Sequence, residues 1–197
     1  MTMTNNEIEF AVLDIFSKYI PRGNSHKQLF KIMQNEGIKF REVASTNAKF
    51  VGAITFGEDN QPYIMVNQGI DNIGRRNFTI AHELGHYFLN HKLHSSSFFC
   101  QDNQISEESE VTNKIEHEAN YFASCFLMPR QKIISAFYAI IRRSNKATTR
   151  NFLLVNNKTF GVWCGIRDSF MERYGVSQAA LRYRLIGLQL VKFEFNT

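Results

Sequence analysis

Cysteine is scarce in this 197-residue chain, which has only Cys100, Cys125 and Cys164. They form no C-x-x-C pair, and an odd number of cysteines cannot close a disulfide framework. A disulfide-stapled secreted scaffold is therefore excluded, and we expect free thiols in a reducing cytoplasm.

Long apolar runs are also absent. The longest uncharged apolar-rich stretch covers residues 133–141, about half of the roughly 20 residues that a membrane-spanning helix needs. The N-terminus carries Glu7 and Glu9 but no basic residues ahead of an apolar segment, so it does not resemble a secretory signal. We expect a protein that makes no membrane contact.

Apolar and charged residues occur in ordinary proportions, 44% and 21%, which favours one packed domain over residues 1–197 and excludes a long disordered tail. The net charge of +5 hides an uneven distribution. Residues 95–129 hold one basic and six acidic side chains, whereas residues 130–197 hold twelve and three. The basic final third raises the question of a nucleic-acid partner.

Apolar periodicity predicts mostly helices. Helical spacing predicts amphipathic helices over residues 7–20 and 26–35, and the period is again helical over most of the chain from residue 75. Between them, β-rich runs at residues 50–56 and 62–67 flank a turn cluster and predict a hairpin. We therefore expect an α+β fold, mostly helical, with a small antiparallel or mixed sheet ahead of the long helical part.

The run HELGH at residues 82–86 is an H-E-x-x-H motif inside a predicted helix, residues 77–91. His86 lies about 40° around the helix from His82 and one turn along it, so both imidazoles can bind one metal ion. Glu83 lies about 100° from His82, which takes its carboxylate off the ion but within reach of a water there. This is the position that a general base needs.

A catalytic zinc site also needs a third protein ligand. The extended motif H-E-x-x-H-x-x-G-x-x-H is absent, because Leu89 and Lys92 stand at its last two defined places. The third ligand must then come from a later element. A predicted helix over residues 115–123 offers two carboxylates, Glu116 and Glu118.

Glu116 and Glu118 point about 200° apart on a helix, so only one of them can face the site. Glu116 shares a face of the helix with Asn120. This placement would let Asn120 hydrogen-bond to a metal ligand and orient it without binding the metal itself. Glu118 lies away from the apolar side chains Ile115 and Phe122 and is interpreted as part of a solvated face. The periodicity slightly favours Glu116.

No donor for a tetrahedral oxyanion is identified from the sequence. The other imidazole and phenol side chains close to these segments are expected to be packing or surface residues: Tyr87, His91, His94, His117 and Tyr121.

Two blocks carry a family resemblance. Residues 75–86, RRNFTIAHELGH, fit the pattern R-x-x-F-T-x-A-H-E-[LI]-G-H, and residues 116–129, EHEANYFASCFLMP, are close to E-x-x-A-N-x-F-A-x-x-[LI]-[LM]-M-P. Both patterns belong, in this order, to the ImmA/IrrE family of zinc metallopeptidases. A weaker likeness lies at residues 174–185, and the whole resemblance covers about residues 25–190.

This resemblance implies that His82, His86 and Glu116 bind zinc and that Glu83 is the catalytic carboxylate. The family has a zincin-like (gluzincin) core, and its members act as cytoplasmic proteases that cut a helix-turn-helix transcriptional repressor. A zinc metalloendopeptidase with a regulatory role is thus implied. Two imidazoles and a carboxylate suit Zn²⁺, although Mn²⁺ or Fe²⁺ also fits such ligands. One departure from the family is the long polar stretch at residues 95–110.

A second hypothesis belongs to another class. Residues 167–190 have the outline of a helix-turn-helix element, with a turn at Gly175, an N-cap at Ser177 and a further helix bearing Arg182 and Arg184. The chain would then be a metal-binding regulatory module that binds DNA or a protein partner with little or no proteolysis. The element lacks a clear base-reading set, so packing on the core or docking of a repressor is the favoured role.

Overall fold

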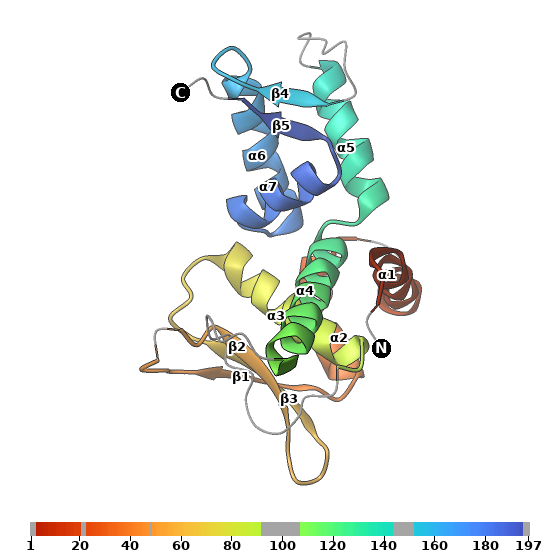
Figure 1. Cartoon of the computed structure of the whole chain (residues 1–197), viewed down its shortest axis with the longest axis vertical. Coiled ribbons are helices and arrows are strands. Elements are labelled where there is room, and N and C mark those ends of the chain that lie inside the picture. Colours follow the sequence, from red (N-terminus) through yellow and green to blue (C-terminus); the bar gives the residue numbers. More distant parts are fainter. Residues whose placement is uncertain (1–2, 21–22, 48, 92–106, 144–151, 195–197) are drawn as a thin grey trace.

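The protein is described by a computed structural model that covers residues 3–20, 23–47, 49–91, 107–143 and 152–194 (Figure 1). Its helices are α1 (Asn5–Tyr19), a 3-10 turn (Ser25–Gln28), α2 (Leu29–Asn35), α3 (Ile73–Phe88), α4 (Glu107–Leu127), α5 (Arg130–Arg143), α6 (Phe160–Tyr174) and α7 (Gln178–Gly187). Its strands are β1 (Lys39–Val43), β2 (Gly52–Phe56), β3 (Pro62–Asn67), β4 (Leu153–Val155) and β5 (Val191–Phe193). Within these residues, every helix is either too short or too polar to cross a bilayer.

The sheet ahead of α3 is small and mixed, which confirms the α+β expectation. β2 and β3 form the predicted hairpin, antiparallel, with Ile54 opposite Ile64. β1 pairs with β3 in parallel, so that Phe40 also lies opposite Ile64 and the strand order is β1-β3-β2. β3 is therefore the central strand, and α3 packs on β2 and β3.

The first helices agree with the predicted ranges apart from their ends. α1 begins before residue 7 because Thr4 and Glu7 form a capping box, in which each side chain bonds the other's backbone N–H. The segment predicted as helix over residues 26–35 is divided into the 3-10 turn and α2.

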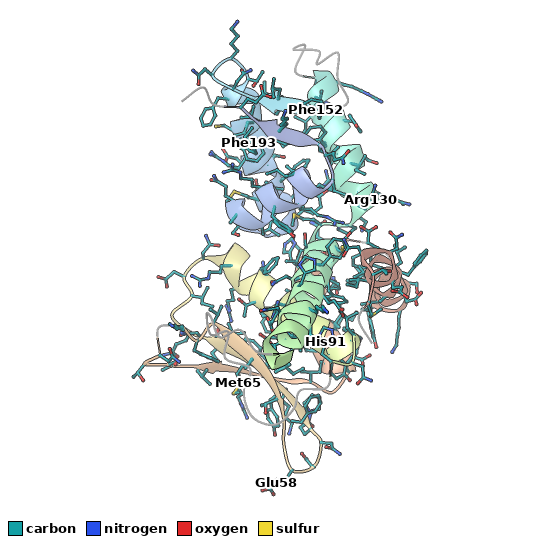
Figure 2. All side chains as sticks on the ribbon, in the orientation of Figure 1. Glu58, Met65, His91, Arg130, Phe152 and Phe193 are labelled. Carbon is teal, nitrogen blue, oxygen red and sulfur yellow. The ribbon has the colours of Figure 1, made fainter. Side chains whose placement is uncertain are left out.

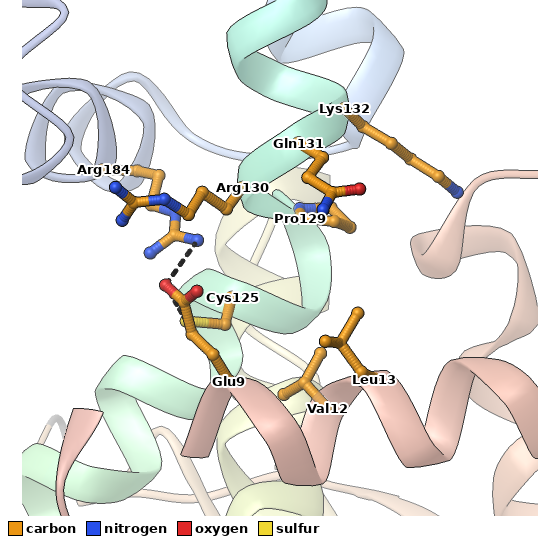
Figure 3. Close-up of a pocket in the computed structure, with 9 residues that line it drawn as sticks. All are labelled: Glu9, Val12, Leu13, Cys125, Pro129, Arg130, Gln131, Lys132 and Arg184. Carbon is orange, nitrogen blue, oxygen red and sulfur yellow. Dashed lines mark hydrogen bonds and ion pairs between the residues drawn. The ribbon is translucent and has the colours of Figure 1, made fainter. Parts of the chain in front are cut away.

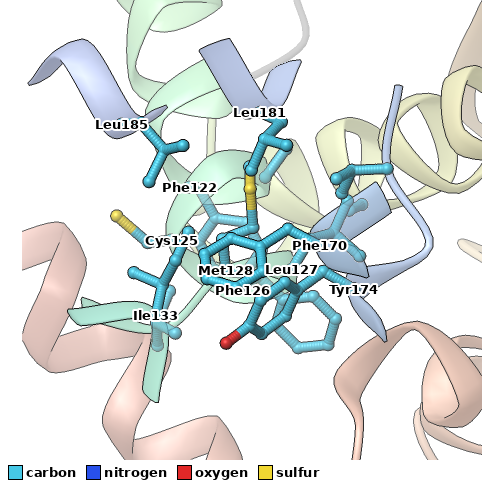
Figure 4. Packing of buried hydrophobic residues seen from close by; sticks show 14 of the residues in the cluster. Phe122, Cys125, Phe126, Leu127, Met128, Ile133, Phe170, Tyr174, Leu181 and Leu185 are labelled. Carbon is cyan, nitrogen blue, oxygen red and sulfur yellow. The ribbon is translucent and has the colours of Figure 1, made fainter. Parts of the chain in front are cut away.

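The chain passes from α4 to α5 into a second group of elements, α5 to α7 with the parallel pair β4 and β5, stacked on the end of the first group (Figure 1). One buried apolar cluster runs through both groups. Figure 4 shows its central part, where side chains from the α4–α5 junction meet those of α6 and α7: Phe126, Leu127, Met128, Ile133, Phe170, Tyr174, Leu181 and Leu185. Apolar burial thus joins the two groups.

The turn between α6 and α7 is packed against the start of α3. The Asn77 amide donates to the Gly175 carbonyl over 2.8 Å. A Cβ atom added at Gly74 would lie 2.3 Å from both the Val176 carbonyl carbon and the Ser177 nitrogen. This close backbone contact fixes the α6–α7 turn against the start of α3.

Arg184, one of the two arginines on the second helix of the suggested helix-turn-helix element, is a buried residue with 4% exposure. It shares the inner face of α7 with Leu181, three residues earlier, which explains why it points inward. Its Nε donates to the Met128 carbonyl over 3.2 Å, and its Nη2 lies 3.6 Å from Glu9 beside a cavity of about 150 Å³ (Figure 3). The inward side chain of Arg184 agrees with the favoured role of this element, packing on the core, and removes one of the two arginines from the helix-turn-helix hypothesis.

Substitution Gly74→Ala tests the packing of α3 on the α6–α7 turn. We expect it to lower the free energy of unfolding by about 1–3 kcal/mol, because the added Cβ meets backbone atoms that cannot rotate away. Gly165→Ala is the matched control, since Gly165 lies in the exposed middle of α6 with open space around its Cα, and there alanine should stabilise by about 0.5–1 kcal/mol. Urea denaturation measures both, and equal effects would contradict the proposed contact.

Candidate metal centre

α3 carries the H-E-x-x-H motif through the protein interior. The helix begins at Asn72, whose side chain accepts from the Arg75 N–H, and every residue from Thr79 to His86 is buried. The sheet covers one side of this segment and α4 covers another. Buried imidazoles and carboxylates are costly unless they are paired, so the polar groups of the motif need partners inside the molecule.

Gly85 sets how closely α4 approaches. A Cβ at this position would lie 3.2 Å from both Cα and O of Ala119 and 3.1 Å from the Phe122 ring. A side chain here would have to displace these atoms by a few tenths of an ångström, so glycine permits the closest approach of the two helices. Because Glu116 precedes Ala119 by about one turn, the same contact brings its carboxylate to the histidines of α3.

Three predicted ligands meet at this point. The Nε2 atoms of His82 and His86 lie 3.0 Å apart. Glu116 places Oε2 3.2 Å from His82 Nε2 and Oε1 3.3 Å from His86 Nε2. One potential ligand atom from each of the three residues lies within 4.8 Å of the others. Two imidazole nitrogens at this separation repel unless a proton or a cation lies between them, so this set of ligands fits a metal ion.

The charges of Glu116 and His86 suit metal binding, whereas His82 has to release a proton to bind a metal ion. Burial opposes ionisation of Glu116, but the imidazoles of His82 and His86 next to it hold the pKa of its carboxyl well below the usual range. Burial lowers the pKa of His86 and so favours the neutral ring. Burial acts in the same direction on His82, yet the carboxylates of Glu116 and Glu83 raise its pKa. An ionised carboxylate and neutral imidazoles are the forms that bind metals.

Glu83 lies beside this cluster without belonging to it. Its carboxyl faces β2, where the Ile54 N–H donates to it. Burial raises the pKa of Glu83 to about 7, although the neighbouring His82 opposes the shift. The site therefore has two carboxyl groups of opposite character: an ionised Glu116 from α4, next to both histidines, and Glu83 of the motif, which exchanges its proton near neutral pH.

The Nδ1 atom of each motif histidine also has a hydrogen-bond partner. His82 Nδ1 lies 3.1 Å from the Asn120 amide oxygen, the contact that the spacing of Glu116 and Asn120 suggests. His86 Nδ1 lies 2.9 Å from His91 Nδ1, and His91 Nε2 lies 3.1 Å from Glu118 Oε2. The interpretation of Glu118 as a solvated side chain is wrong: it is 4% exposed, because α4 turns it towards the end of α3 and the N-terminal segment covers it.

The other residues considered from the sequence lie elsewhere. The hydroxyls of Tyr87 and Tyr121 donate to Glu36 and Glu9, away from the metal-ligand cluster, and His117 is exposed. Three further predictions, on His94, on Cys100 and on most of the polar stretch at 95–110, lie outside the described residues. His91, predicted to be a packing or surface residue, instead contacts His86 and Glu118. It follows His86 by five residues, and no known motif marks it.

A buried H-E-x-x-H helix on a small mixed sheet, with a carboxylate from the next helix beside both histidines, defines a zincin-like α+β fold. Residues 33–186 match the Peptidase M78 family, described as the IrrE N-terminal-like domain, and the chain therefore belongs to this family. It is accordingly a metallopeptidase-like protein.

Among solved structures, a Mycobacterium tuberculosis transcriptional regulator is similar, with a TM-score of 0.54 and 20% sequence identity over 92% of this chain and 48% of that one. This likeness shows the fold alone, and the chain spans about half the length of that regulator. A search of curated proteins finds no match.

Glu83→Gln should stabilise the metal-free protein at pH 8 and hardly at pH 5. Since the folded-state pKa of about 7 lies above the ordinary 4.5, the folded protein holds more protons between these values and loses stability as the pH rises through them. The difference amounts to about 2–3 kcal/mol at pH 8. Urea denaturation after chelation measures it, with Glu58→Gln on the exposed β2–β3 turn as the control. An equal gain at both pH values would contradict the shift.

Proposed function

We propose that the chain, acting as one domain over residues 1–197, is a zinc-dependent metalloendopeptidase of narrow specificity that cleaves a helix-turn-helix transcriptional repressor. The observation that carries the proposal is the convergence of His82, His86 and Glu116, with Glu83 next to this cluster but outside it. Membership in a peptidase family supports the reaction class. The repressor as substrate rests on the resemblance to the ImmA/IrrE proteases, and the fold shared with a transcriptional regulator is compatible with it.

His82, His86 and Glu116 would hold the metal. Zinc bound there supplies Lewis-acid chemistry: it lowers the pKa of a water towards neutrality and polarises the scissile carbonyl. The identity of the metal is part of the proposal, because the same two imidazoles and carboxylate also suit Mn²⁺ or Fe²⁺.

Glu83 is the proposed general base and acid. Its carboxylate would accept a proton from the attacking water and then deliver that proton to the leaving amine. A pKa near 7 suits both steps at neutral pH, because the group gains and loses a proton with little driving force either way. The Ile54 N–H holds the carboxylate on the β2 side of the cluster while the proton moves.

DNA binding through residues 167–190 loses support. Arg184 is buried and the turn at Gly175 packs on α3, so neither is free to contact a DNA groove. We therefore propose a protein substrate as the partner. The free thiols of Cys125 and Cys164 suit the proposed cytoplasmic location.

Metal analysis tests the proposed ligands. We expect about one zinc per chain in the wild-type protein and its loss in His82→Ala and Glu116→Ala, since a site with two remaining protein ligands binds weakly. His117→Ala, one residue from Glu116 but on the exposed face of α4, is the matched control and should keep its zinc. Stoichiometric zinc in both ligand variants would refute the site.

Cleavage tests the role of Glu83. When the chain is co-expressed with a candidate helix-turn-helix repressor from the same genome, we expect the repressor to be cut by the wild-type protein. Glu83→Gln should slow cleavage by about 10²- to 10⁴-fold, the usual contribution of a general base, while keeping its zinc. Loss of zinc from this variant would make Glu83 a ligand instead, and undiminished cleavage would remove it from the reaction.

A further inference from the structure

The end of α3 turns His91 back onto the metal centre. After the helix, Asn90 adopts a left-handed conformation with φ of 51°, and the His91 N–H donates to the His86 carbonyl over 3.1 Å. The Asn90 N–H donates to the Tyr87 carbonyl over 3.2 Å, which completes a Schellman motif. The rings of His86 and His91 consequently lie edge to face, with centroids 5.0 Å apart. Figure 2 labels His91 at this place, beside α4.

The hydrogen bonds of this segment have one consistent direction. An ionised carboxylate only accepts, so His91 Nε2 donates its proton to Glu118 Oε2, 3.1 Å away. The neutral His91 ring is then left with a lone pair on Nδ1, which accepts from the His86 Nδ1–H over 2.9 Å. His86 is thereby in the tautomer whose Nε2 lone pair faces His82 and Glu116.

The hydrogen bond between His91 and Glu118 is buried inside the protein. The side chains of His91 and Glu118 are 5% and 6% exposed. Burying a carboxylate is costly unless its oxygens are hydrogen-bonded, and here the second oxygen accepts from the Met3 backbone N–H over 2.8 Å. The N-terminal segment, the end of α3 and α4 thus all contribute to one polar chain that ends at His86.

The two histidines of the motif differ in the partner that accepts the hydrogen bond from Nδ1. His82 donates to the neutral amide of Asn120, whereas His86 donates to an imidazole that is itself bonded to a carboxylate. A ligand histidine that donates to a carboxylate-backed partner becomes a stronger electron donor to its metal.

We propose that His91 and Glu118 are positioning residues, which hold His86 in its metal-binding tautomer and strengthen its bond to the metal. This inference rests on the proposed metal site but goes beyond it, since neither residue is a ligand. Glu118 is held at His91 and takes no part in the cluster of His82, His86 and Glu116.

Zinc titration of the metal-free protein against a competing chelator tests this role. His91→Leu removes the acceptor for His86, and we expect zinc to bind about 10- to 100-fold more weakly. His91→Asn matches leucine in size but keeps an oxygen close to the place of Nδ1, so it should recover at least fivefold of that loss. His117→Leu, exposed on α4, is the matched control and should bind as tightly as the wild type.

The outcomes separate the two proposals. If the wild-type protein binds no zinc, the metal site itself is refuted. If the wild type binds zinc and His91→Leu binds within twofold as tightly, only the positioning role is refuted. The positioning role is also refuted if His91→Leu and His91→Asn bind zinc equally weakly, because a purely structural role would lower the zinc affinity of both variants alike. Thermal unfolding of the metal-free variants checks that each is folded at the titration temperature.

Discussion

The close approach of α3 and α4 at Gly85 is the constraint on which the site depends. With only a hydrogen at position 85, the Ala119 backbone can lie against α3, and this contact brings Glu116 between the two histidines. A larger residue would press on the Ala119 backbone and on the buried Phe122 ring, which would have to move by a few tenths of an ångström even for an added Cβ. The glycine of the HELGH run therefore shapes the site as much as the polar residues on either side of it.

Three carboxylates within this small region have different environments and, in our account, different roles. Glu116 lies 3.2 and 3.3 Å from Nε2 of the two histidines and stays ionised, as a metal ligand must. Glu83 is buried against β2 with one backbone donor, so its pKa lies near neutral pH, as a general base requires. Glu118 is bonded to His91 and to the N-terminal backbone, and acts on the metal only through His86. All three are glutamates, so their different roles come from their surroundings and not from the residue type.

Local patterns in the sequence predict much of this molecule. Helical spacing predicts α1 and α3, the turn cluster predicts the β2–β3 hairpin, and these elements are found. Long-range contacts are different, because they depend on which segments meet in the folded chain. The parallel pairing of β1 with β3 and of β4 with β5 has no local signal. For the same reason the sequence could not show that Glu118 lies beneath the N-terminal segment or that Arg184 turns inward towards Met128.

The central claim is that His82, His86 and Glu116 surround a single zinc ion. Anomalous diffraction at the zinc absorption edge, from crystals of the zinc-loaded protein, tests it most directly because it locates the metal independently of activity. Our account predicts one strong peak, bonded to Nε2 of both histidines and to the Glu116 carboxylate. A peak at Glu118 or at the exposed His117, with none between the two histidines of α3, would contradict it.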